Sequence, residues 1–334
     1  MATFAAGVAA LFLFVAIVDP YDTLALSPAW KRHRVSGNER FSFPGLVRHG
    51  RFDSAVFGTS TVMLLDPKRL DALFGGSFAN LAMGSATAWE QAQLMDYFRT
   101  HAPQVRTLIV AMDVSWCSPD RPAPALTFRP FPPWQYDEEP WNDYAYLLNT
   151  RALAHAVRQA LVLSGLARPG FRSDGYFQFV PDDSLYDPRR ARRELWGDRP
   201  RQEPPPDRRP VAGPAPPDWT FPDLAMLERT LSAMPASSLK VLMFAPYHVS
   251  VLATEEARRR YAHCKSAVTA LAGRVPNTAV VDFMIPNSLT RDDTAYWDPL
   301  HYRIDHAREL EAALAEAVLQ GRSSGDLYEV LARP

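Results

Sequence analysis

Short apolar runs alternate with segments of helical spacing along most of the chain. The runs have the length of buried strands and lie at 52–57, 77–83, 105–112, 239–245 and 278–283. Apolar residues recur at helical intervals between them, at 86–101, 224–234, 254–272 and 304–320. Buried strands that alternate with helices of this length are typical of α/β proteins. The pattern therefore predicts a mostly parallel sheet with helices on both faces.

The alternation breaks between the third and fourth runs. Residues 119–221 carry one helix-like pattern, at 142–163, and end in a proline-rich stretch at 198–217 that we expect to be extended or disordered. Around this insertion, residues 51–325 are interpreted as one α/β domain. Residues 21–50 hold several prolines and glycines, so we expect them to form an irregular tether.

The most biased segment is the apolar run at 4–18, which contains no charged residue. It is short against the ~20 residues of a spanning helix and overlaps the length of a signal-peptide core. The run ends at Asp19-Pro20-Tyr21 without the small residues that signal peptidase prefers. We therefore expect residues 1–20 to be an uncleaved transmembrane anchor, with a cleaved signal or a buried core helix as alternatives. The basic residues at 31–34 leave the topology open, and a periplasmic or other extracytoplasmic body on a single-pass anchor is the expectation.

Net charge and cysteine content make some classes of function unlikely for this chain. The formal net charge of -1 over 334 residues gives no reason to expect a nucleic-acid partner. The two cysteines, Cys117 and Cys264, lie in no cluster with the spacing of zinc ligands, so we expect no metal. Buried unpaired thiols are the favoured interpretation, and a single disulfide is the alternative.

Ser60 is the candidate nucleophile. A strand at 52–57 runs into Gly58-Thr59-Ser60, and helical spacing resumes directly afterwards. Sites in open α/β sheets form beyond the carboxyl ends of the strands. The amino end of a following helix would also present free N–H groups and a positive dipole at the serine.

A serine needs a base, and the base needs a partner that fixes its tautomer. Asp298 and His301 supply both groups three residues apart, after the last run and just before the last helix. The loop that carries them is expected to rise at the same sheet edge as Ser60.

The serine near the start and the D-x-x-H near the end resemble the SGNH/GDSL hydrolase superfamily. Gly58-Thr59-Ser60 matches the first block, usually G-D-S, and Asp298 with His301 matches the fifth. The layout resembles a membrane-anchored branch that includes the D-alanyl transfer protein of teichoic-acid systems and exopolysaccharide O-acetyltransferases. The likeness spans about residues 52–319 as a pattern, with two specific motifs.

This resemblance implies a three-layer, flavodoxin-like α/β/α fold and an acyl-Ser60 intermediate. His301 would be the general base, Asp298 its orienting carboxylate, and the amides of Ser60 and Gly84 the oxyanion donors. The third block, G-x-N-D, is missing, because the chain reads Met112-Asp113-Val114 where the family places its asparagine. No cofactor is implied. The acceptor would be a cell-envelope polysaccharide, and the acyl donor would come from a membrane-bound O-acyltransferase partner.

Other residues near predicted strand ends are pocket candidates. They are Thr59, Asp113, Trp116, Tyr247, His248 and Trp297. Aromatic residues at such positions either stack on a sugar or pack against their own loop. Three functions remain open at this point: an O-acyltransferase, a plain esterase that releases the acyl group to water, and a non-catalytic anchored assembly or binding subunit. The missing asparagine favours the last, and the intact serine, histidine and aspartate oppose it.

Overall fold

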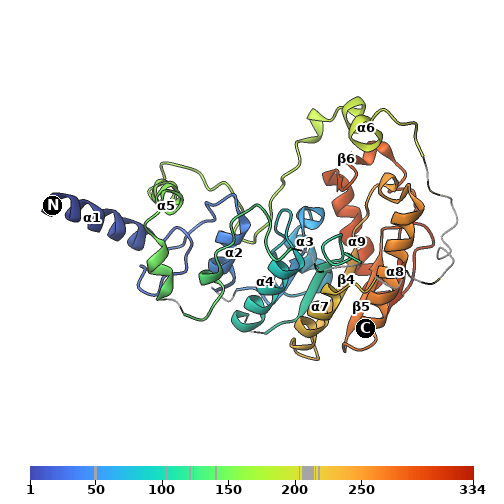
Figure 1. The fold of residues 1–334 in the computed structure, drawn as a ribbon, viewed down its shortest axis with the longest axis horizontal. Coiled ribbons are helices and arrows are strands. Elements are labelled where there is room, and N and C mark those ends of the chain that lie inside the picture. Colours follow the sequence, from blue (N-terminus) through green and yellow to red (C-terminus); the bar gives the residue numbers. More distant parts are fainter. Residues whose placement is uncertain are drawn as a thin grey trace.

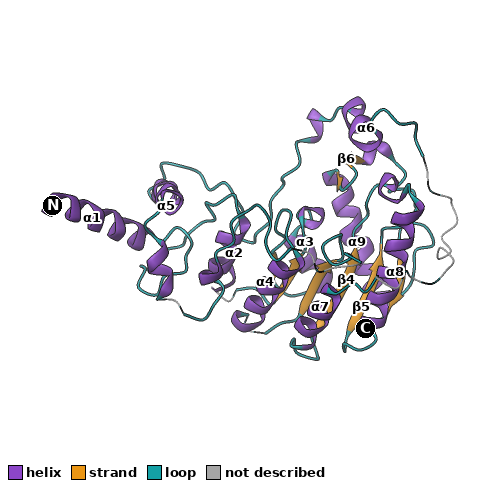
Figure 2. Ribbon diagram, in the orientation of Figure 1, coloured by secondary structure: helices purple, strands orange, loops and turns teal. Residues whose placement is uncertain are grey.

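A computed structural model describes residues 1–334 except 49–50, 103, 120–121, 123, 140, 203, 205–213, 215 and 217–218. Its centre is a six-stranded sheet in the order β2-β1-β3-β4-β5-β8 (Figures 1 and 2). The strands are β1 (Ser54–Phe57), β2 (Phe78–Asn80), β3 (Thr107–Ala111), β4 (Leu239–Phe244), β5 (Thr278–Asp282) and β8 (Glu329–Ala332). β1 to β5 pair in parallel, and β8 pairs antiparallel to β5. The predicted mostly parallel α/β sheet is confirmed.

Helices cover both faces of this sheet. They are α3 (Pro67–Phe74), α4 (Ala88–His101), α7 (Asp223–Ser232), α8 (Glu255–Ala272) and α9 (Ile304–Gln320). α7 packs against both α4 and α8, whereas α3 packs against α9. Two helical layers thus enclose the sheet, and strands β1, β3 and β5 are buried along their whole length between them.

Local sequence explains where these helices begin. Thr87 and Glu90 form a reciprocal capping box at the start of α4, and Asp66 caps α3, with Pro67 in the first helical position. Thr254 caps α8 by accepting from the Ala257 amide. Each cap satisfies an N–H that the helix itself leaves without a partner.

The N-terminal apolar run forms helix α1 (Ala2–Val18), which has 17 residues. At 1.5 Å per residue it is about 26 Å long, against the ~30 Å of a bilayer hydrocarbon core. None of the helices in the described part of the chain is long and apolar enough to cross a membrane. The expected transmembrane helix is therefore not supported.

The segment at 21–50 is more ordered than a tether. It contains helix α2 (Glu39–Arg48), in which Pro44 is tolerated near the middle, and Phe43 and Val47 join the main core. Arg40 is fully buried and forms a two-point ion pair with Glu90 of α4, at 2.8 and 2.6 Å. Proline and glycine punctuation concealed this helix, because tertiary packing outweighed local propensity.

The insertion between β3 and β4 contributes two helices. α5 (Thr150–Leu163) packs against α1, and α6 (Pro188–Trp196) lies against the loop before α9. The helix expected at 142–163 is split, because residues 142–146 form a separate 3₁₀ turn. The proline-rich stretch at 198–217 falls largely outside the described residues.

Candidate functional site

Ser60 lies just beyond the carboxyl end of β1, at the first position of a 3₁₀ turn, Ser60–Val62. The turn depends on Gly58, whose φ is 155° and whose missing Cβ would lie 2.7 Å from atoms of Ala111 and Val62. Only glycine fits this approach without displacing the neighbouring strand. The expected helix does not start at the serine: α3 begins at Pro67, so its dipole is not aimed directly at Ser60.

Asp298 and His301 lie on a small hairpin made of β6 (Tyr296–Asp298) and β7 (His301–Tyr302). The carboxylate oxygen Asp298 Oδ1 accepts the backbone N–H groups of Leu300 and His301, which fixes the turn. Its other oxygen, Oδ2, is 2.6 Å from His301 Nδ1. The hairpin thus holds the Asp298 carboxylate and the His301 imidazole in a fixed relative position.

Ser60 completes the arrangement. Its Oγ is 2.7 Å from His301 Nε2, although the two residues are 241 positions apart. With Nδ1–H donating to Asp298, the neutral imidazole presents the Nε2 lone pair to the serine hydroxyl. This is the order of groups that activates a serine nucleophile.

The electrostatics of Asp298 fit that order. Burial pushes the pKa of its carboxyl upward. The hydrogen bond and charge of His301, together with two backbone N–H groups, outweigh burial and lower the pKa below its usual value. Asp298 is therefore ionised at neutral pH and can accept the hydrogen bond from His301 Nδ1.

Gly84 follows β2, next to the turn that carries the serine. The Met83 amide donates to Gly58 O at 3.0 Å, so the two loops run side by side. In the described part of the chain, neither the Ser60 amide nor the Gly84 amide donates a hydrogen bond to another protein group. Both N–H groups are therefore available for an oxyanion.

Two arginines surround Gly84. Arg40 Nη1 donates to the Gly84 carbonyl at 3.2 Å. A Cβ at position 84 would lie 3.3 to 3.4 Å from Nη1, Cζ and Nη2 of Arg129, so this guanidinium lies face-on against the glycine. Arg129 belongs to the insertion and also faces Glu39 at 3.6 Å. No motif in the sequence indicated it.

Asn80, at the end of β2, has a structural role. Its Nδ2 donates to the carbonyls of Val62 and Leu65 at 2.9 Å, and its Oδ1 accepts the Ala82 amide. One side chain thus ties the loop after Ser60 to the loop before Gly84.

A cavity of about 290 Å³ opens beside the histidine. His301, Asp298 and Trp297 line it from the hairpin, and the insertion contributes the rest: Phe179, Val180, Pro181, Asp187, Arg190, Ala191 and Glu194. The Phe179 ring meets the His301 ring edge-on, with centroids 5.1 Å apart. Trp297 lines the cavity as expected. Its Nε1–H is buried and has no hydrogen-bond partner among the described residues.

Four other candidates lie inside the protein and do not line this cavity. Trp116 is fully buried and donates from Nε1 to Gln91 at 3.0 Å. Tyr247 and His248 are buried behind the hairpin. Asp113 is buried as well, and burial raises the pKa of its carboxyl despite hydrogen bonds from Ser115. All four face inward because the loops after β3 and β4 fold back on the core.

Thr59 is half-buried beside Ser60. Its hydroxyl lies 3.3 Å from that of Thr61, so it contacts its own turn.

His248 belongs to a second serine–histidine–aspartate set. Its Nδ1 is 3.0 Å from Ser250 Oγ, and its Nε2 is 3.2 Å from Asp293. Burial is the largest influence on His248 and lowers its pKa to about 4, although Asp293 opposes the shift. Trp196 of α6 donates to Asp293 at 3.1 Å. His248 is fully buried, so we call this the closed set; it attaches α6 to the 3₁₀ turn before the hairpin.

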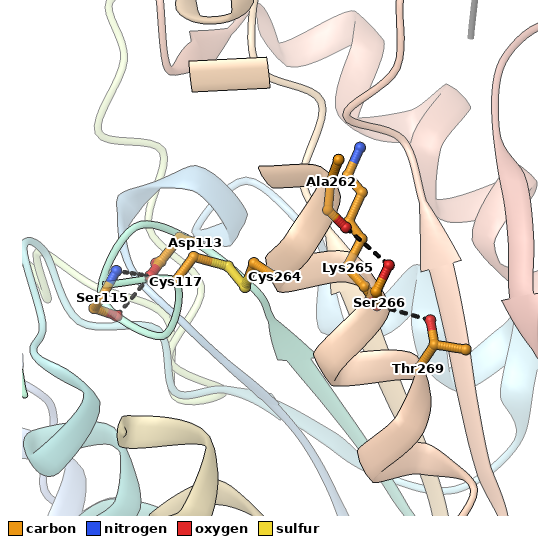
Figure 3. Close-up of a disulfide and its surroundings, with 8 residues drawn as sticks. All are labelled: Asp113, Ser115, Cys117, Ala262, Cys264, Lys265, Ser266 and Thr269. Atoms are coloured by element: carbon orange, nitrogen blue, oxygen red, sulfur yellow. Dashed lines mark hydrogen bonds between the residues drawn. A yellow bond between two sulfur atoms is a disulfide. The ribbon is translucent and has the colours of Figure 1, made fainter. Parts of the chain in front are cut away.

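The two cysteines are paired, which overturns the expectation of free thiols. Cys117, in the loop after β3, forms a disulfide with Cys264 of α8, with Cα atoms 5.6 Å apart (Figure 3). The sequence could not show this proximity, because 147 residues separate the two. The described residues contain no group of three or more His, Cys, Asp or Glu side chains that could hold a metal ion.

Comparison with models of known protein families, with curated proteins and with solved structures finds no match to this chain. The geometry of the site is therefore the main guide to function.

Proposed function

We propose that the chain is a serine esterase or O-acyltransferase that works through an acyl-Ser60 intermediate. The observation that carries this proposal is the continuous hydrogen-bonded chain from Ser60 through His301 to Asp298. Chance pairs of these residues are common, but a chain of three in the right order, at the carboxyl edge of a parallel sheet, is the arrangement of activated serines. The proposed fold family is the flavodoxin-like SGNH type.

In the first half-reaction, Ser60 Oγ attacks the carbonyl carbon of an ester while His301 Nε2 takes the hydroxyl proton. The backbone N–H groups of Ser60 and Gly84 donate hydrogen bonds that stabilise the negative charge developing on the carbonyl oxygen. As the tetrahedral intermediate collapses, the ester C–O bond breaks and His301 returns the proton to the leaving alcohol. The acyl group is then bonded to Ser60.

In the second half-reaction, His301 deprotonates water or an acceptor hydroxyl, which attacks the acyl carbon. Ser60 leaves and regains its proton. A water acceptor gives an esterase, and a sugar hydroxyl gives an O-acyltransferase. Phe179 and Trp297 are half-buried and line the cavity, where an aromatic face suits a sugar ring. We therefore propose a cell-envelope polysaccharide as substrate or acceptor, with the acyl group supplied by a membrane-bound O-acyltransferase partner.

The disulfide between Cys117 and Cys264 supports an extracytoplasmic location for this chemistry, because disulfides persist mainly in oxidising compartments. In this proposal the site works at the cell envelope, on the outer side of the cytoplasmic membrane.

A fluorophosphonate probe tests the proposal on the full-length chain. Wild-type protein should be labelled, and Ser60→Ala and His301→Ala should lose labelling while keeping the wild-type melting temperature. Ser250→Ala is the matched control, because Ser250 also contacts a histidine but lies in the closed set, and it should stay labelled. Folded wild-type protein that resists labelling would support the alternative, a non-catalytic assembly or binding subunit.

A further inference from the structure

Helix α1 projects from the body of the protein and is apolar on every side. Figure 1 shows it running away from the sheet along the long axis. Thr3 is its one polar residue, and side chains on different faces are open to solvent: Phe4 is 77% exposed, Leu13 56% and Ile17 48%. A helix without a polar face is normally covered by a protein core or by lipid. In this chain, only the carboxyl-terminal part of α1 is covered, through Val15 and Val18.

Helix α5 supplies that cover and has a second apolar face of its own. Ala152 and Ala156 pack in the cluster that contains Val15 and Val18 of α1. On the other side, Val157 and Leu161 lie one turn apart and are 46% and 38% exposed. In Figure 1, α5 is seen nearly end-on beside α1, so the two helix axes cross steeply.

Basic and aromatic side chains border these apolar faces. Arg158 lies on the exposed side of α5, and Arg168 follows the helix; both are exposed. Trp141 and Tyr146, just before α5, are 57% and 47% exposed. Arginines beside an apolar helix face attract anionic headgroups, and tryptophan and tyrosine favour the boundary between headgroups and acyl chains.

We propose that α1 and α5 together form a docking surface for an anionic phospholipid bilayer. α5 lies along the membrane surface with Val157 and Leu161 below the headgroups, and α1 dips into the acyl region without spanning it. A protein groove or a second copy of the chain would suit an amphipathic helix, whereas α1 offers no polar face to leave in water. The basic border then selects anionic lipid.

A single fluorescent label tests this proposal. The sequence has two cysteines and both are in the disulfide, so Leu161→Cys in the full-length chain carries the one reactive thiol. We expect an environment-sensitive dye at this position to shift to the blue with phosphatidylglycerol-containing vesicles and to be quenched by brominated acyl chains. The control is Leu185→Cys, at a side chain that is 71% exposed and lies in the insertion outside α1 and α5. It should show neither effect.

Three results would overturn the proposal: equal responses at the two positions, equal binding to pure phosphatidylcholine vesicles, or a shift at position 161 that follows protein concentration without vesicles. The last would indicate self-association. This measurement does not depend on ester chemistry. A negative result would therefore argue against membrane docking and would not bear on the proposed acyl transfer.

Discussion

The disulfide between Cys117 and Cys264 is expected to contribute a large part of the stability of the sheet. It joins the loop after β3 to helix α8 and closes a loop of 147 residues that contains the whole insertion. The chain-entropy relation for a closed loop of this size gives a stabilisation of about 5 kcal/mol, and measured values usually lie at about 2–4 kcal/mol. We expect the double variant Cys117→Ala/Cys264→Ala to lose about 2–5 kcal/mol in the free energy of unfolding.

Urea unfolding followed by circular dichroism measures this loss. With a slope of about 3 kcal/mol/M, the unfolding midpoint should fall by about 1 M in the variant. A reducing agent should lower the midpoint of the wild type to the same extent and leave the variant unchanged. The reasoning would be refuted if thiol titration of unfolded, unreduced wild type found two free thiols, or if reduction left its midpoint in place.

Three further predictions concern buried groups around the site. Glu90→Gln removes the close counter-charge of buried Arg40 and leaves the Glu39 carboxylate, at 3.9 Å, as its remaining partner; it should lower the free energy of unfolding by about 3 kcal/mol in urea titrations. Gly84→Ala places a Cβ against the Arg129 guanidinium; it should lower kcat for an aryl ester by up to about 100-fold while the melting temperature stays close to wild type. In the unfolded chain the imidazole of His248 has the ordinary histidine pKa of about 6.5, whereas in the folded protein its pKa is about 4. Stability should therefore fall by about 2 kcal/mol from about pH 7.5 to about pH 5, and His248→Gln should remove that part of the pH dependence.

The sheet was predictable because each strand and helix can be recognised from the apolar spacing of its own residues. Five buried strands and the four long helices that follow them each carry their own periodicity, and the structure places them within a few residues of the expected bounds. β8 and α2 were not predicted. β8 pairs antiparallel at the edge and is half-buried, and α2 contains a proline whose cost is offset by buried contacts of Phe43 and Arg40.

The three central residues of the site were predictable for a different reason. Gly58-Thr59-Ser60 and Asp298 with His301 are short motifs at strand ends, and a parallel sheet brings such ends to one edge. The walls of the cavity were not predictable, since Phe179 and Arg190 come from an insertion without regular spacing. The same holds for Arg129, which the insertion places beside Gly84. Likewise, the inward orientation of Trp116 and His248 depends on how their loops fold back, which periodicity does not encode.

The separation of 241 positions between Ser60 and His301 sets the order in which the site can form during synthesis. The strand that carries Ser60 leaves the ribosome well before the hairpin that carries His301. At about 5–20 residues per second, the serine waits for about 12–48 seconds before a histidine can reach it. A nascent or truncated chain that stops before the hairpin therefore lacks the proposed base for Ser60, so the proposed chemistry begins only once the hairpin has been made.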